Sequence, residues 1–123
     1  MIKLTFCVKR RPDITKEEFD RYWYEHHAKL VKKNASALKI KRYVQVPVLD
    51  RPSAQESIRK SRGAMSLEFD GIAELWWESF EDLVAGGKSK EGRKASLELL
   101  EDEKKFIDLS KSMIWYGEER EIF

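Results

Sequence analysis

The chain has 123 residues, the size of one domain with its own hydrophobic core. A composition of 41% hydrophobic and 37% charged residues excludes a disordered chain, and a net charge of +2 is too small to indicate a nucleic-acid partner. One cysteine excludes an internal disulfide and a zinc cluster, so we expect a reducing, cytoplasmic location. No apolar run approaches the roughly 20 residues that cross a bilayer, so no membrane partner is expected.

The first third of the chain predicts a strand followed by a helix. Residues 2–9 alternate between apolar and polar side chains, which is typical of a half-buried strand. A polar break with a proline follows, and then a capping box in which Thr15 is the N-cap and Glu18 lies three residues on. The helix has apolar and aromatic residues at the spacing of one buried face. We expect it to end near Asn34.

The middle of the chain predicts two strands and a long connection. The second strand is expected over residues 40–49, where Pro47 indicates an edge strand or a strand end. The polar connection over residues 50–66 is typical of a mobile lid over a pocket and contains a possible short helix at residues 54–60. The third strand is expected over residues 69–77.

The last third predicts two helices and a strand. Ser79 caps a short helix that the glycines at 86–87 are expected to end. An amphipathic helix follows over residues 89–107, and a last strand over residues 112–123 ends in two large apolar residues. These residues predict either an ordinary strand end or an arm that packs on a partner subunit.

The order of elements, strand-helix-strand repeated twice, predicts an α+β ferredoxin-like fold with a four-stranded antiparallel sheet. We find no internal repeat, so residues 1–123 are interpreted as a single domain. Both main helices would cover one face of the sheet and leave the other face bare. That second face is too apolar to remain in water, so we predict that two chains pack sheet to sheet as a homodimer.

Several segments resemble one known family. Residues 3–31, KLTFCVKRRPDITKEEFDRYWYEHHAKLV, resemble the opening of EthD-domain proteins, in which a strand ends in Arg-x-Pro, a helix begins Thr/Ser-x-Glu-Glu-Phe, and Tyr-Trp precedes His-Ala-x-Leu. Residues 42–44 and 70–76 are similar to the second and third strands of that family. Lys29 replaces a common proline, and the doublet at 26–27 replaces a single histidine. The resemblance implies a dimeric α+β barrel of ferredoxin-like subunits.

The resemblance also implies a class of chemistry. Relatives include muconolactone-type isomerases, and polyketide dehydratases, cyclases and decarboxylases. We therefore expect a lyase or isomerase that uses acid–base chemistry, without cofactor or metal, on a small aromatic, polyketide-like or lactone substrate. The alternative is a non-catalytic protein that binds or carries a small hydrophobic ligand in the same pocket. A haem-handling protein is a third interpretation, which rests on one histidine.

Two adjacent histidines lie on the first helix. His27 matches the family's histidine, and an imidazole with a pKa near neutral pH can donate or accept a proton. A buried histidine that hydrogen-bonds a backbone carbonyl is the structural alternative. His26 lies about 100° round the helix, so the two rings do not share a face that would bind one metal. Tyr22 is expected to lie off the face of His27.

Four residues are expected to form the catalytic site: His27, Tyr43, Glu74 and Asp70. The phenol of Tyr43, on the second strand, would polarise a carbonyl. Glu74 and Asp70 lie four residues apart on one strand face, where either would orient His27; ion pairs on a solvated face are the alternative. Cys7 lies in mid-strand and is interpreted as a small hydrophobe.

Overall fold

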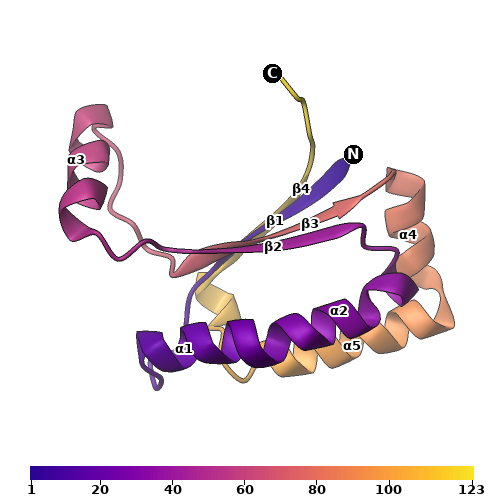
Figure 1. The fold of residues 1–123 in the computed structure, drawn as a ribbon. Coiled ribbons are helices and arrows are strands. Elements are labelled where there is room, and N and C mark those ends of the chain that lie inside the picture. The colour runs from indigo at the N-terminus through magenta and orange to yellow at the C-terminus, as the bar shows by residue number, and fades with distance from the viewer.

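The structure is a computed structural model that describes all 123 residues as a four-stranded antiparallel sheet with most of its helices on one face (Figure 1). The strands are β1 (Ile2–Val8), β2 (Arg42–Pro47), β3 (Gly71–Trp77) and β4 (Met113–Glu118). Their spatial order is β2-β3-β1-β4. The α+β ferredoxin-like class predicted from the sequence is confirmed. Pro47 ends an edge strand, where its missing N–H leaves no ladder partner unsatisfied.

The first helical segment runs without a break through three pieces. They are α1 (Lys16–Tyr22), the π-helix η1 (Trp23–His27) and α2 (Ala28–Leu38). The predicted capping box is confirmed, because Thr15 Oγ1 accepts from Glu18 N at 3.1 Å and the Glu18 carboxylate accepts from Thr15 N at 3.2 Å. The helix passes the expected end at Asn34, whose side chain instead donates to Glu98 at 2.9 Å. It ends before Lys39, which adopts a left-handed conformation.

The π-helix keeps one stripe of side chains on the sheet. The buried residues of this stripe are spaced four apart: Phe19, Trp23, His27 and Val31. In a regular α-helix, residues four apart drift round the axis by about 40° at each step. The wider turn of η1 reverses that drift, and π turns of this kind often mark functional sites. His27 therefore faces the interior, in phase with the core residues on either side of it.

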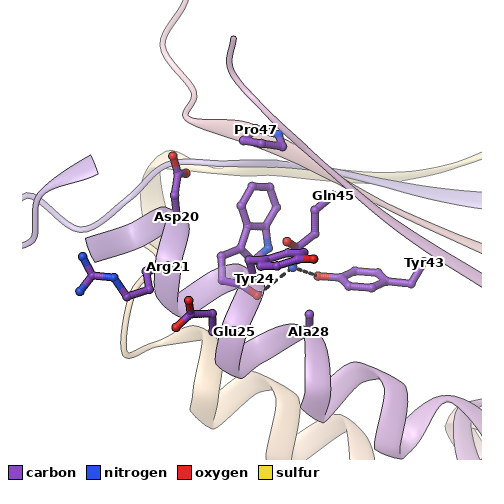
Figure 2. A pocket seen from close by; sticks show the side chains of 9 residues that line it. Asp20, Arg21, Tyr24, Glu25, Ala28, Tyr43, Gln45 and Pro47 are labelled. Carbon is purple, nitrogen blue, oxygen red and sulfur yellow. Dashed lines mark hydrogen bonds between the residues drawn. The ribbon is translucent and has the colours of Figure 1, made fainter. Parts of the chain in front are cut away.

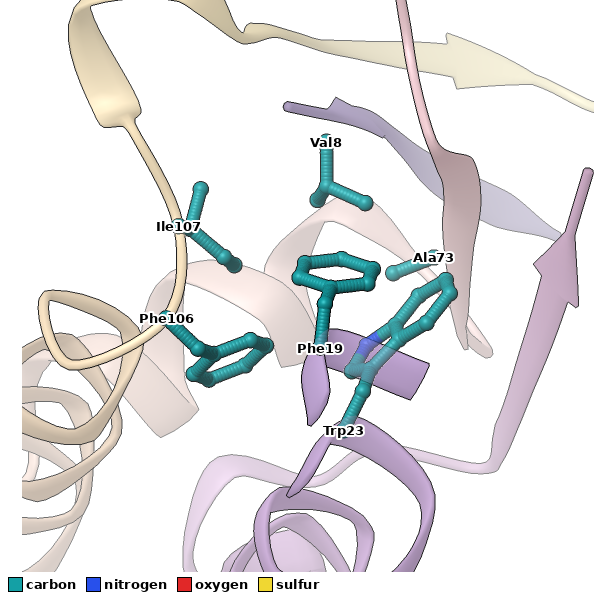
Figure 3. Packing of buried hydrophobic residues seen from close by; sticks show 6 residues of the cluster. All are labelled: Val8, Phe19, Trp23, Ala73, Phe106 and Ile107. Atoms are coloured by element: carbon teal, nitrogen blue, oxygen red, sulfur yellow. The ribbon is translucent and has the colours of Figure 1, made fainter. Parts of the chain in front are cut away.

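Two clusters of buried apolar side chains fix the helices to the sheet. The larger one joins β1, α1, η1, β3 and the segment after α5 (Lys90–Glu103), as Figure 3 shows: Val8, Phe19, Trp23, Ala73, Phe106 and Ile107. The smaller one joins α2 to α5: Val31, Leu38, Ala95 and Leu99. Each large apolar side chain buried in this way contributes roughly 1.5–3 kcal/mol.

The helices α4 (Phe80–Lys88) and α5 (Lys90–Glu103) form a tight pair that corrects one expectation. Ser79 caps α4 as predicted, since its Oγ accepts from Asp82 N at 3.1 Å. Gly86 and Gly87, however, lie inside α4 and do not end it. The backbone at Gly86 lies so close to α2 that no side chain would fit, so the first of these glycines serves packing rather than termination.

The connection between β2 and β3 contains α3 (Pro52–Arg62), which confirms and lengthens the helix expected at residues 54–60. No residue of α3 is buried, and none lines either of two cavities of about 710 and 530 Å³. In Figure 1, α3 stands beyond one end of the sheet, on the side opposite α1 and α2. The structure therefore does not place this segment as a lid.

The sheet face away from the helices is uncovered and of mixed character. Met113 and Trp115 of β4 lie on it with about half of each side chain exposed. Lys3 and Arg42 place their cationic groups 5.0 and 4.7 Å from the ring centroid of Trp76. The face thus combines exposed apolar surface with a cationic and aromatic cluster.

None of the helices combines the length and the apolar character that a membrane crossing requires.

Candidate active site

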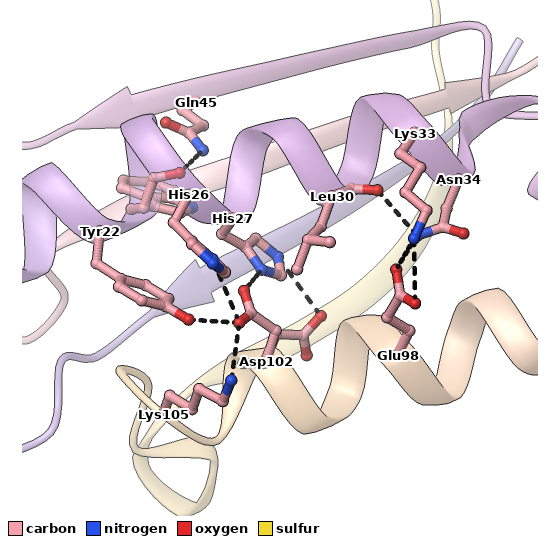
Figure 4. Close-up of polar contacts among 12 residues, drawn as sticks. Tyr22, His26, His27, Leu30, Lys33, Asn34, Gln45, Glu98, Asp102 and Lys105 are labelled. Carbon is pink, nitrogen blue, oxygen red and sulfur yellow. Dashed lines mark hydrogen bonds and ion pairs between the residues drawn. The ribbon is translucent and has the colours of Figure 1, made fainter.

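A buried carboxylate near the end of α5 contacts polar side chains of α1 and η1 (Figure 4). Asp102 is only 3% exposed, and its Oδ2 lies 2.7 Å from Nδ1 of His27. The hydroxyl of Tyr22 donates to Asp102 Oδ1, so Tyr22 joins His27 at one carboxylate although the helix periodicity predicted otherwise. His26 Nδ1, at 3.5 Å, and Lys105 Nζ, at 3.7 Å, lie at the rim. Asp102 is therefore the group that orients His27.

The directions of the pKa shifts define the protonation of this pair. Burial lowers the pKa of His27, and the Asp102 carboxylate opposes that effect only in part. Burial raises the pKa of Asp102, but hydrogen bonds from Tyr22 and His27 outweigh it, so the pKa falls below its ordinary value. At neutral pH a neutral His27 donates Nδ1–H to an ionised Asp102. Its Nε2 is left with a free lone pair.

That lone pair faces a second carboxyl group. Glu103 Oε2 lies 3.9 Å from His27 Nε2. Burial raises the pKa of Glu103 to about 7, and the negative charge of Asp102 adds to the effect. A carboxyl group with this pKa is present in both protonation states at neutral pH, which is the condition for general acid–base catalysis.

Glu103 lies in the wall of a cavity of about 530 Å³ between the sheet and the helices α4 and α5. Thirteen of the 17 residues that line the cavity are hydrophobic, and Glu103 is the one carboxylic acid among them. The sheet contributes Leu4, Phe6, Leu75 and Trp77 to the lining. His27 itself does not line the cavity. The arrangement therefore presents Glu103 to a small apolar ligand, with His27 and Asp102 behind it.

Tyr43 opens on a different cavity, of about 710 Å³, between η1 and β2 (Figure 2). Its hydroxyl accepts from Gln45 Nε2 at 2.9 Å, and the same amide donates to the carbonyl of Trp23 at 2.9 Å. Burial raises the pKa of Tyr43 to about 12, and the nearby charge of Glu103 contributes to this rise. The phenol is thus a neutral hydrogen-bonding group that lines this cavity and not the apolar cavity beside Glu103.

The structure does not bring Glu74 or Asp70 to His27, so the expectation that either would orient the imidazole was wrong. Glu74 lies on the uncovered face of the sheet, where it forms an ion pair with Lys3. Asp70 precedes β3 and accepts a hydrogen bond from Arg10 N at 2.8 Å. The alternating directions of strand side chains explain the error, because the helices cover the other face of β3.

Sequence reasoning missed Asp102 and Glu103, although α5 carries a signal for the first. The buried residues of α5 are Gly92, Ala95, Leu99 and Asp102, spaced three and four apart. An aspartate in phase with an apolar stripe indicates a buried carboxylate with a specific partner. Leu97 and Leu100 also have a helical spacing in this segment, but both are exposed. No group of three or more His, Cys, Asp or Glu residues is placed to hold a metal ion.

Comparisons with known proteins agree with this architecture. A structure of an ethyl tert-butyl ether D (EthD) family protein from Bacillus halodurans is similar over 98% of this chain and 99% of its own, with a TM-score of 0.64 and 20% identity. A protein from Arabidopsis thaliana is similar over 100% and 99%, with a TM-score of 0.61 and 11% identity. A dimeric ferredoxin-like protein of unknown function from Thermobifida fusca is similar over 94% and 88%, with a TM-score of 0.55 and 12% identity.

At these identities the solved structures show the fold alone. A search of curated proteins found no match to the chain. The model of the EthD domain, in contrast, matches residues 11–110, which include the capping box, the π-helix with both histidines and the Asp102–Glu103 pair. The chain belongs to the EthD domain family.

Proposed function

We propose that the protein is a cofactor-independent enzyme that moves a proton on a small aromatic, polyketide-like or lactone substrate. One observation carries the proposal. Glu103, whose pKa is raised to about 7, lies in the wall of an apolar cavity with the lone pair of His27 Nε2 only 3.9 Å behind it. Isomerisation, dehydration, cyclisation and decarboxylation all need such a group, because each requires a proton to leave or join a substrate atom at neutral pH.

In this proposal Glu103, His27 and Asp102 have different roles in the proton transfer. The Glu103 carboxylate takes a proton from a substrate carbon beside a carbonyl, and the same carboxyl group returns it to another atom. His27 Nε2 lies 3.9 Å from that carboxyl group, and Asp102 holds the imidazole in place behind it through Nδ1. His27 thus acts through Glu103 as a positioning residue, where the sequence predicted direct contact. The role of Tyr43 in polarising a carbonyl stays a prediction, and Glu74 and Asp70 have no part in the proposal.

A carrier of small hydrophobic ligands is the second candidate. The cavity beside Glu103 favours it, because hydrophobic residues make up 13 of its 17 lining positions. In a carrier the carboxyl group would serve only to bind a polar end of the ligand. Binding without turnover distinguishes this function from the proposed one.

Hydrogen exchange on a probe tests the enzyme proposal. A panel of aryl methyl ketones and unsaturated lactones is incubated in D₂O, and loss of the acidic C–H signals is followed by proton NMR. We expect the wild-type protein to accelerate exchange of at least one probe near pH 7. Glu103→Gln should slow that exchange at least about 100-fold, because it removes the proton-transferring group.

Glu101→Gln is the matched control for this experiment. Glu101 lies on the same helix, is exposed and pairs only with Lys104, so exchange should remain at the wild-type rate. Equal exchange by the Glu103→Gln and wild-type proteins would contradict the proposal. Probes that bind the wild-type protein without exchanging would identify a carrier.

We also propose that two chains pair through the uncovered faces of their sheets. Trp115 and Met113 are exposed apolar residues on that face, and contiguous apolar surface of this kind is typical of interfaces. The similar protein from Thermobifida fusca is described as dimeric and ferredoxin-like, which supports the proposal.

Light scattering at micromolar concentration should then give about twice the 14.5 kDa of one chain. Trp115→Glu places a charge in the proposed interface and should give a monomer, because an unpaired charge is costly to bury. Leu97→Glu, an exposed position on the helical side of the molecule, should leave the dimer intact. A wild-type monomer would contradict the proposed pairing.

A further inference from the structure

The cavity of about 710 Å³ between η1 and β2 is separate from the one beside Glu103, since the two share no lining residue. Its volume lies within the range of roughly 300–1,000 Å³ that is typical of sites for small molecules. Three aromatic residues line it, two from η1 and one from β2: Trp23, Tyr24 and Tyr43. The cavity is therefore a candidate site for a ligand of its own.

The π-helix fixes the orientation of the Gln45 amide beside this cavity. In an α-helix the Trp23 carbonyl would accept from His27 N, four residues on, but in η1 it accepts from Ala28 N, five residues on. The same carbonyl accepts a second hydrogen bond from Gln45 Nε2 at 2.9 Å. Because a carbonyl oxygen only accepts, the amide has to turn its NH₂ group, and not its oxygen, toward Trp23.

This orientation leaves the hydroxyl hydrogen of Tyr43 without a partner in the chain. Gln45 Nε2 gives its second hydrogen to Tyr43 Oη at 2.9 Å, as Figure 2 shows. The phenol oxygen is the acceptor in that bond, and its own O–H donates to no atom of the chain. Burial raises the pKa of Tyr43 to about 12, so the hydrogen stays on the phenol at neutral pH. Tyr43 therefore offers a hydrogen-bond donor to a molecule in the cavity.

The charges around the cavity disfavour an anionic ligand. The carboxyl groups of Asp20 and Glu25 line it, and the guanidinium of Arg21 is the one cationic group among the lining residues. An anion that accepts from Tyr43 would meet this excess of acidic groups. An uncharged carbonyl oxygen accepts the same hydrogen bond without that repulsion. The lining thus favours a neutral aromatic compound with a carbonyl group.

We propose that this cavity is a second ligand site, which binds an uncharged aryl ketone through a hydrogen bond from Tyr43 Oη to the carbonyl oxygen of the ligand. The ring of the ligand packs against Trp23 and Tyr24 in the cavity wall. Gln45 acts as a positioning residue, because it holds the phenol oxygen and leaves the phenol hydrogen free. The site does not use Glu103, so it is independent of the proposed function.

Methyl NMR locates the ligand and measures its affinity. Acetophenone is titrated into protein with ¹³C-labelled alanine and valine methyl groups. The dissociation constant is taken from the shift of the Ala28 methyl group, which lines this cavity, while Val84 reports on the cavity beside Glu103. α-Methylstyrene, in which a CH₂ group replaces the carbonyl oxygen, is titrated as the isostere without an acceptor. We expect both compounds to shift Ala28.

Two variants remove the donor in different ways. Tyr43→Phe keeps the ring but has no hydroxyl, so acetophenone should bind about tenfold more weakly and α-methylstyrene with unchanged affinity. Gln45→Glu keeps the phenol, but the new carboxylate accepts the phenol hydrogen, so the same selective loss is expected. Tyr116→Phe is the matched control, because it removes a phenol from the wall of the other cavity and should bind both compounds as the wild type does.

The outcomes separate this site from the proposed function. Absence of a shift at Ala28 would overturn the second site, whatever happens at Val84, and would leave the chemistry at Glu103 standing. Equal losses for both compounds in Tyr43→Phe would also overturn it, because the change would then act on the shape of the cavity and not on the hydrogen bond. A selective loss in a protein that exchanges no probe hydrogen would support the second site alone.

Discussion

Replacing Glu103 with Gln should make the protein more stable than the wild type at pH 8. The pKa of Glu103 is about 7 in the folded chain and has its ordinary value of 4.5 when the chain is unfolded. The folded state therefore holds this proton more tightly, and folding stability falls as the pH rises from 4.5 to 7. The difference between the two pKa values corresponds to about 3 kcal/mol above pH 7. Gln carries no charge at any pH, so the Glu103→Gln protein does not lose this folding stability as the pH rises.

Thermal unfolding at two pH values measures the effect. At pH 8 the melting temperature of Glu103→Gln should exceed that of the wild type by about 10 °C, given the size of the domain. At pH 4, where Glu103 is protonated in both the folded and the unfolded chain, the two proteins should have the same melting temperature. Glu101→Gln should match the wild type at pH 8, because Glu101 is exposed. A Glu103→Gln protein no more stable than the wild type at pH 8 would show that the carboxyl group is not buried at an energetic cost.

Gly92→Ala should destabilise the fold by at least about 3 kcal/mol, the upper range for overpacked cores. A Cβ at position 92 would lie 1.6 Å from the carbonyl oxygen of Gly86. The obstacle is backbone of α4, so no side-chain rotation relieves the overlap. Ser89 Oγ lies 2.9 Å from Gly92 N and donates to Gly86 O at 3.1 Å, so separating the helices also breaks the cap of α5.

Gly87→Ala is the matched control for that change. Gly87 lies inside α4 with no atom near the position of a new Cβ. Alanine is a better helix former than glycine, so this variant should gain about 0.5–1 kcal/mol. Urea unfolding of the three proteins gives both differences. Gly92→Ala with wild-type stability would mean that α4 and α5 can separate freely, and the cavity they help to enclose would not be preformed.

The fold was largely predictable because its signals are local. The alternation in β1, the capping box at Thr15 and the cap at Ser79 each depend on neighbouring residues, and all three are confirmed. The glycines of α4 were misinterpreted for the opposite reason. Gly86 is required by the close approach of α2 and α5 to α4 in the folded chain, which no local pattern records.

The site was predictable only in part. His27 was distinguished from His26 by its place in the family motif, and the structure buries His27 while His26 remains half exposed and stacks on Tyr22. The carboxylate that orients His27 lies 75 residues away on another helix, so a search among nearby strand residues could not find it. Glu103 owes its raised pKa to burial and to Asp102, and burial is a property of the tertiary structure.

The acid–base character of Glu103 is the claim on which the proposed function depends, and carboxyl titration by NMR tests it without any substrate. Glutamate side chains labelled with ¹³C are followed from pH 4 to pH 9, and Glu103→Gln identifies the resonance that disappears. We predict a midpoint near 7 for Glu103, well above the ordinary value of 4.5. A midpoint near 4.5 would contradict the account, because Glu103 would then be a permanently ionised side chain with no proton to give at neutral pH.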